Sequence, residues 1–206
     1  QESAADQAAL RFLDAAGVSA RGLYEFLKVL EDQDLLSVRL QDPYLRTHPI
    51  TRDRIDFMTH HLERSGYSSA ALSAEFVRLH ARMRTKLFAF IRPLHRTLKK
   101  YPPTDVSVDA RYARAIAYYL KPDLARALPL IDGLIAADRA NPYFHELKGQ
   151  MLFENGRVKE ALAPYRTAVR LLPESSLLRI SLAQTLIETG REAETREAAR
   201  HLHSAL

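Results

Sequence analysis

Residues 141–174 read NPYFHELKGQMLFENGRVKEALAPYRTAVRLLPE, and this stretch decides how the second half of the chain folds. Apolar residues recur at helical spacing on both sides of Asn155-Gly156, and Pro173 ends the pattern. The stretch therefore predicts two short helices joined by a turn. Similar residues occur 34 positions before it and 34 positions after it. The matching sets are Ala115, Gly149 and Ala183; Tyr118, Leu152 and Leu186; and Pro122, Gly156 and Gly190.

A period of 34 residues with two helices in each unit is typical of the tetratricopeptide repeat. The clearest copy has the small, large and turn residues of such a unit in the expected order. They are Gly149, Leu152, Gly156, Ala161, Tyr165, Ala168 and Pro173. The third copy keeps this order only if about three extra residues follow Gly190. Three units are close to the minimum that buries a continuous core, so we predict an α-solenoid of about three repeats over residues 106–206.

The composition narrows the class of protein. Of 206 residues, 47% are hydrophobic and 27% are charged, which is typical of a globular protein. Cysteine is absent, and this excludes disulfides and thiolate chemistry. No run of about 18 apolar residues occurs, so we expect no membrane-spanning helix. The first residues, QESAADQAALRF, have no basic region and no cleavage site, so we do not expect them to form a signal peptide.

The positive charge is local. Between Phe76 and Thr104 there are eight Lys or Arg residues and no acidic residue, although the whole chain has a net charge of only +5. Three interpretations are open for this segment: a solvated helix face, contact with an anionic membrane through residues 78–100, and binding of nucleic acid. We do not expect nucleic acid, because no nucleic-acid-binding motif accompanies the cations.

The first part of the chain also predicts helices and no strand. A helix over residues 2–16 is expected to end at Gly17, where a left-handed backbone is typical. Further helices are expected over residues 20–32 and 51–64. Residues 33–50 contain two prolines that disfavour helix in the residues before them, so an extended connection is expected there.

The longest predicted helix covers residues 69–91 and is amphipathic. Its apolar stripe consists of Phe76, Leu79, Met83, Leu87 and Phe90, whereas Arg78, Arg82 and Lys86 line another side. Pro93 is expected to kink or end this helix, and Pro102-Pro103 separates it from the repeats. We therefore predict an all-α chain with three parts: residues 1–66, a basic linking helix and hinge over 67–105, and the repeat domain over 106–206.

Two short segments resemble parts of a known family. Glu2 and Asp6 lie four positions apart, so on a helix they share one face, with small residues between them. This looks like the E-x-x-A-D segment of the BepA-like and HtpX-like zinc metallopeptidases. Residues 42–55, DPYLRTHPITRDRI, look like the His-Pro segment of the periplasmic, BepA-like members, which also have C-terminal tetratricopeptide repeats. The order of the three parts is the same, and the resemblance covers nearly the whole chain.

The resemblance implies roles for individual residues. Glu2 would be the third protein ligand of a zinc ion whose other ligands are the histidines of an HExxH helix. Asp6 would orient one of those histidines through its second ring nitrogen. His48 would face the metal and could compete for an open zinc position. The fold implied for residues 1–66 is a helical remnant of the metallopeptidase domain.

The chain departs from that family in one respect. It contains no HExxH, and the nearest fragment, His145-Glu146-Leu147-Lys148-Gly149, has no second histidine. It also has no phosphate-binding glycine loop and no Gly-x-Ser-x-Gly elbow. We therefore expect a C-terminal part of such an enzyme, with zinc in the full-length protein. By itself this chain is expected to bind no zinc tightly and to be inactive, which leaves its assignment as an enzyme open.

The first helices of stacked repeats normally form a concave binding face. The positions expected to line it are Tyr112, Ile116, Tyr119, Glu146, Gln150, Phe153, Ile180, Gln184 and Ile187. This lining is aromatic and apolar with few cations, so it does not suit a C-terminal carboxylate. An extended apolar segment fits better: an unfolded or outer-membrane client, a protein partner, or a helix of the same chain.

These observations lead to two functional hypotheses. The first is a zinc-dependent endopeptidase for cell-envelope protein quality control in a Gram-negative bacterium. It would be periplasmic or envelope-associated, with a signal peptide upstream. The alternative is a non-enzymatic tetratricopeptide scaffold that recruits a partner protein. An HExxH helix encoded upstream of Gln1 would distinguish the first from the second.

Overall fold

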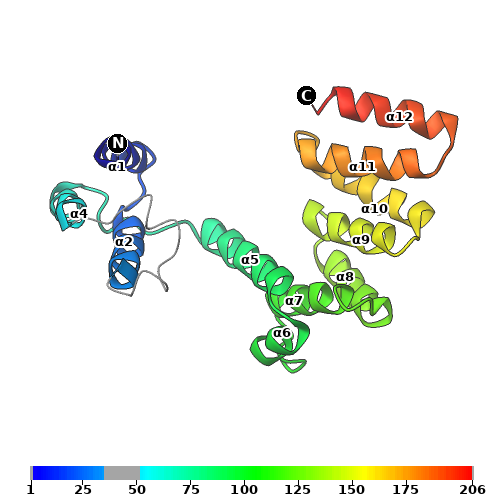
Figure 1. Ribbon diagram of the computed structural model, residues 1–206, viewed down its shortest axis with the longest axis horizontal. Helices are drawn as coiled ribbons and strands as arrows, with labels where there is room; N and C mark the ends of the chain where they lie inside the picture. Colours follow the sequence, from blue (N-terminus) through cyan, green and yellow to red (C-terminus); the bar gives the residue numbers. More distant parts are fainter. Residues whose placement is uncertain (1, 35–51, 206) are drawn as a thin grey trace. The chain divides into compact units, whose positions relative to one another are not determined.

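Figure 1 shows the computed structural model, which describes residues 2–34 and 52–205. Over these residues every regular element is an α-helix, so the all-α prediction is confirmed. The helices are α1 (Glu2–Ala15), α2 (Arg21–Asp34), α4 (Arg52–Arg64), α5 (Ala74–Ile91), α6 (Leu94–Lys100), α7 (Val108–Tyr119), α8 (Leu124–Ala137), α9 (Pro142–Glu154), α10 (Val158–Leu171), α11 (Ser176–Glu188) and α12 (Glu192–His203). None of these helices is long and apolar enough to cross a membrane.

The chain divides into two compact units, residues 1–78 and 79–206. The division falls inside α5, whereas the sequence suggested limits after residues 66 and 105. The difference arises because the second half of α5 belongs to the repeat unit. Ala89 is fully buried there and is part of its hydrophobic core.

The first unit contains α1, α2 and α4, which enclose a small apolar core. Its buried members are Leu10, Ala20, Leu27, Ile55 and Met58. As expected, α1 ends before Gly17, whose φ of 65° lies in the left-handed region that glycine tolerates. The N–H of Val18 then donates to the carbonyl of Leu13, which closes the helix end.

The second unit is a stack of helix pairs, α7–α8, α9–α10 and α11–α12 (Figure 1). The period of 34 is visible in the residues that start each pair. The side chains of Ser107, Asn141 and Ser175 each accept a hydrogen bond from a backbone N–H in the first turn of α7, α9 and α11, respectively. Each pair therefore begins with the same local structure, and the solenoid of about three repeats is confirmed.

Gly149 explains why α9 and α10 pack so closely. A Cβ atom built on Gly149 would lie 2.8 Å from the ring of Tyr165, closer than such atoms approach one another. The turn between the two helices contains Gly156, with a φ of 76°, and Gly190 takes a φ of 70° one unit later. Pro122, the matching residue of the first repeat, also has a positive φ of 23°.

Most of the apolar stripe of helix α5 is exposed to solvent, although Phe90 packs against the core. Leu87 exposes 54% of its surface and Ile91 exposes 64%, whereas Thr85 and Ala89 on another side are buried. An amphipathic helix normally buries its apolar stripe, so this orientation is unusual. The helix begins at Ala74 and not at residue 69, and the hydroxyl of Ser73 accepts the N–H of Phe76 near its start.

Candidate functional site

The segment that resembles a metallopeptidase places two carboxylates on one side of α1. Asp6 is buried, with 5% of its surface exposed, and Glu2 is half-buried one turn before it. Both approach Arg54, which projects from α4. The Nε of Arg54 donates to Oδ2 of Asp6 at 2.7 Å, and Nη2 donates to Oδ1 at 2.8 Å. The Nη1 atom lies 3.4 Å from Oε2 of Glu2.

This arrangement holds α1 against α4 and compensates a buried charge. A buried carboxylate is costly unless it is paired and hydrogen-bonded, and the two parallel bonds from Arg54 satisfy Asp6 on both oxygens. Sequence reasoning gave Arg54 no role, although it lies in the quoted His-Pro segment. The signal that could have found it is the expected burial of Asp6, which calls for a cationic partner.

The described residues do not by themselves form a zinc site. They contain no group of three His, Cys, Asp or Glu side chains placed to hold a metal ion. Glu2 offers one carboxylate, whereas protein zinc sites use three or four ligands. Both oxygens of Asp6 are bonded to Arg54, so the proposed role of Asp6 as a partner of a histidine stays a prediction. His48 lies outside the described residues.

The repeat face predicted to bind peptides has two distinct halves. In the first half, Tyr112, Ile116 and Tyr119 are buried within the chain and are not available to a ligand. The ring of Tyr112 packs edge-on to Phe144, with centroids 5.3 Å apart. The hydroxyl of Tyr119 donates to the carboxylate of Glu154. Burial, followed by this carboxylate, raises the pKa of Tyr119, so its phenol stays a donor.

Helix α5 accounts for part of this burial, because its long cations reach α7 and α9. The Nε of Arg82 lies 3.4 Å from Oδ1 of Asp109, and its guanidinium lies 5.3 Å from the ring centre of Phe144. The Nζ of Lys86 donates to Oε2 of Glu146 at 3.0 Å. Over the first two repeats, therefore, α5 lies on the predicted binding face. A helix of the same chain was one of the occupants expected there.

In the second half the predicted positions are more open. Ile180, Gln184 and Ile187 are exposed on α11, and Gln150 and Phe153 are half-buried on α9. This region is defined here as the α9–α11 face, and it is apolar with two amides. The Nε2 of Gln150 donates to Oε1 of Glu154 at 2.9 Å, so one amide already has a partner.

The buried polar atoms near α5 form a small cluster. The hydroxyl of Tyr112 and the Nη1 of Arg82 have no hydrogen-bond partner among the described residues. Burial, followed by the nearby carboxylate of Glu146, raises the pKa of Tyr112 above its usual value. Buried polar groups of this kind are commonly satisfied by an internal water molecule.

Two protein families match different parts of the chain. Residues 1–62 match Peptidase family M48, and residues 92–142 and 123–176 match the tetratricopeptide repeat. The chain therefore combines a Peptidase family M48 segment with tetratricopeptide repeats. Glu2, Asp6 and Arg54 all lie within the matched peptidase segment.

Known proteins add little to these two matches. No curated protein matched the sequence. Among solved structures, the chain is similar to "MamA AMB-1 P212121", with 19% identity over 97% of this chain and 91% of that chain. The TM-score is 0.43, so we draw no conclusion on function or assembly from it.

Proposed function

We propose that this chain is the C-terminal part of a zinc-dependent endopeptidase in which the repeats bind the protein substrate. The observation that supports this proposal most is the cluster of Glu2, Asp6 and Arg54 within a Peptidase family M48 segment that is followed by tetratricopeptide repeats. The match of residues 1–62 to Peptidase family M48 favours a peptidase over a scaffold.

In this proposal Glu2 supplies one carboxylate ligand to the zinc ion. The histidine ligands come from an HExxH motif, which these 206 residues do not contain. Arg54 keeps the α1 carboxylates in place by holding Asp6 through two hydrogen bonds. The chain alone is therefore not expected to hydrolyse peptide bonds.

The repeats would handle the substrate through the α9–α11 face. Ile180 and Ile187 are exposed there, and few cations lie beside them, so an extended apolar segment of an unfolded protein suits this face. Unfolded or outer-membrane proteins are the client class that we propose, in the periplasm or envelope of a Gram-negative bacterium. The lack of cysteine is compatible with that compartment.

The peptidase part is tested by metal binding and by the reading frame upstream of Gln1. We expect an upstream HExxH motif and, in the longer protein, stoichiometric zinc that the substitution Glu2→Gln weakens by about tenfold or more. Isothermal titration with zinc measures this loss. Submicromolar zinc binding by the 206-residue chain alone would contradict the proposal, as would a frame without HExxH, which would favour the scaffold.

The repeat part is tested separately with a denatured client protein. The double substitution Ile180→Asp and Ile187→Asp should weaken binding of reduced, unfolded client by about tenfold or more, because it places two charges in an apolar contact. Val106→Asp is the matched control, since Val106 is exposed and lies outside the α9–α11 face. Fluorescence anisotropy with a labelled client measures both. Unchanged binding in the double variant would exclude this face as the client site.

A further inference from the structure

The second half of α5 contributes to a surface that combines exposed apolar residues with cations. Two neighbouring clefts form it, with volumes of about 430 and 280 Å³. Ile91 and Arg92 line both clefts, so the two are adjacent. We call this region the basic–apolar surface. The residues used below are Arg84, Leu87, Ile91, Arg92, Leu120 and Lys121.

No acidic residue lines either cleft. Apolar side chains line part of each cleft: Leu87, Phe88 and Ile91 in the larger and Leu94 and Leu120 in the smaller. This lining is complementary to a ligand with an anionic group and an apolar body.

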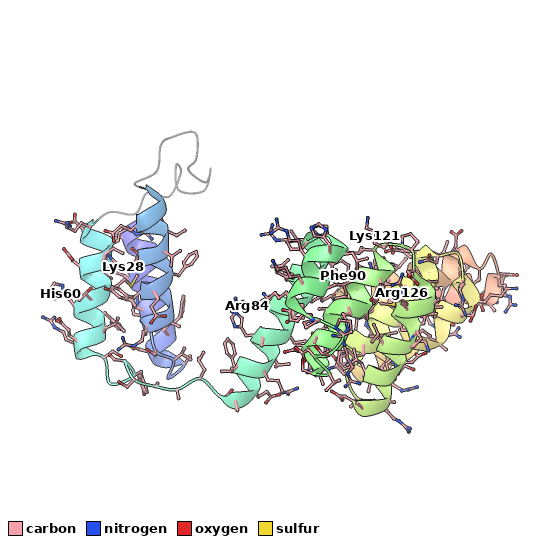
Figure 2. All side chains as sticks on the ribbon, turned by 90° about the horizontal axis from the view of Figure 1, so that it is seen from below. Lys28, His60, Arg84, Phe90, Lys121 and Arg126 are labelled. Carbon is pink, nitrogen blue, oxygen red and sulfur yellow. The ribbon has the colours of Figure 1, made fainter. Side chains whose placement is uncertain are left out.

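The basic residues between Arg82 and Lys100 differ in whether they have a partner within the repeat unit. Arg82 and Lys86 pair with acidic residues of the repeats, and Lys100 lies 4.2 Å from the ring centre of Phe88. By contrast, Arg84 and Arg92 are exposed and form no ion pair with any residue that the structure describes. Figure 2 shows Arg84 projecting from α5 away from the repeat helices. These two cations thus keep their charge available for an external anion.

The apolar side chains beside them are also exposed. Ile91 and Leu87 follow one another by one turn on α5, and Leu120 is exposed at the end of α7. An apolar stripe flanked by Arg and Lys is the arrangement of helices that lie in the interface of an anionic bilayer. Long cations can reach phosphate groups while apolar residues enter the acyl boundary.

We propose that the basic–apolar surface docks the repeat unit onto an anionic phospholipid membrane. Ile91, Leu87 and Leu120 enter the interfacial region, and Arg84, Arg92 and Lys121 contact the phosphates. An acidic protein could use the cations, but it would not require the exposed apolar stripe and the two acid-free clefts together. This proposal is independent of the peptidase assignment, because every residue in it belongs to the repeat unit.

The first test is co-sedimentation of the whole chain with vesicles of phosphatidylcholine, with and without phosphatidylglycerol. We expect binding only when phosphatidylglycerol is present, with loss at high salt. The double substitution Arg84→Gln and Arg92→Gln should weaken it by at least tenfold. The matched control is Arg139→Gln with Arg170→Gln, which removes the same charge from exposed positions elsewhere in the repeats and should bind normally.

The second test reports insertion. The chain has no tryptophan, so Ile91→Trp introduces a single indole on the basic–apolar surface. Its emission should shift to shorter wavelength on anionic vesicles, whereas Leu177→Trp, at an exposed position of α11, should not shift.

Three results would overturn the proposal. They are no vesicle binding, equal loss in the control pair, and equal emission shifts at both tryptophans. Binding of poly-glutamate that depends on Arg84 and Arg92, with no binding of vesicles, would instead indicate an acidic protein partner and would also overturn it.

Discussion

The two compact units of this chain differ in how completely each buries its own apolar residues. The repeat unit has two clusters of buried residues, and many of them are fully inaccessible to solvent. Among its described residues, the first unit buries the apolar residues Leu10, Ala20, Leu27, Ile55 and Met58, and Phe12, Phe26 and Val29 are exposed. The repeat unit is thus expected to be stable alone, whereas the described part of the first unit has a small core and relies on the buried Arg54–Asp6 pair.

The largest expected effect comes from breaking that ion pair. Arg54→Ala leaves the buried carboxylate of Asp6 without its partner, and removing one member of a buried pair typically costs about 3–5 kcal/mol. Hydrogen exchange should accelerate in α1 and α4 and stay unchanged in α9 and α10. Arg64→Ala, at the exposed end of α4, is the control. Unchanged exchange in α1 would show that the pair does not hold the first unit together.

The next largest effect is expected on the stability of the repeat unit. Gly149→Ala puts a methyl group against the ring of Tyr165, so we expect a loss of about 1–3 kcal/mol. Gly133→Ala is the matched control, because it is also a helical glycine and its added Cβ would have an ordinary contact distance of 3.8 Å. That control should be neutral or stabilising by up to about 1 kcal/mol. Urea unfolding followed by circular dichroism distinguishes the two, and equal stability would disprove the close approach.

A smaller effect concerns how α5 is held on the repeats. Lys86 and Glu146 form a partly exposed pair, so their coupling energy should be about 0.5–1 kcal/mol and should fall with added salt. A double-mutant cycle with alanine at both positions measures it by hydrogen exchange in α5. Arg84→Ala on the same helix should cause no change. Coupling that salt leaves unaltered would argue against an electrostatic attachment.

The smallest effect is a dependence on pH at the C-terminal end. Burial lowers the pKa of His201 below its ordinary value of 6.5, although Glu197 opposes this. The unfolded chain then binds more protons than the folded one, so stability falls as pH drops below about 6.5. We expect a loss below about 1 kcal/mol, because both side chains are partly exposed. Thermal unfolding at pH 7 and at pH 5.5 measures it, and His201→Gln should remove this part of the pH dependence.

Local features of the fold were predictable from the sequence, and long-range pairs were not. The turn at Gly156 and the start of α9 at Asn141 depend on residues within a few positions, so their period of 34 indicates the repeat directly. By contrast, Arg54 and Asp6 are 48 positions apart, and Lys86 and Glu146 are 60 apart. The pairing of cations with acidic residues depends on how the helices pack against one another. The periodicity of the sequence does not predict this packing.

The same reasoning explains the outcome for the candidate site. The predicted face included Tyr112, Ile116 and Tyr119 because their spacing places them on the first helix of a unit. Their burial depends on packing against other helices, such as that of Tyr112 on Phe144 and of Tyr119 beside Glu154, so the helical pattern of α7 alone could not show it. For α11 the pattern was sufficient to predict the exposure of Ile180 and Ile187.

The similar starts of the helix pairs have a consequence for how this protein could change in length. Ser107, Asn141 and Ser175 each satisfy the first turn of a pair with their own side chain, and each pair packs mainly on its immediate neighbours. Duplication or loss of one whole 34-residue unit would therefore disturb one interface and leave the others intact. The length of the repeat stack can therefore be altered in steps of one repeat without redesigning the rest of the chain.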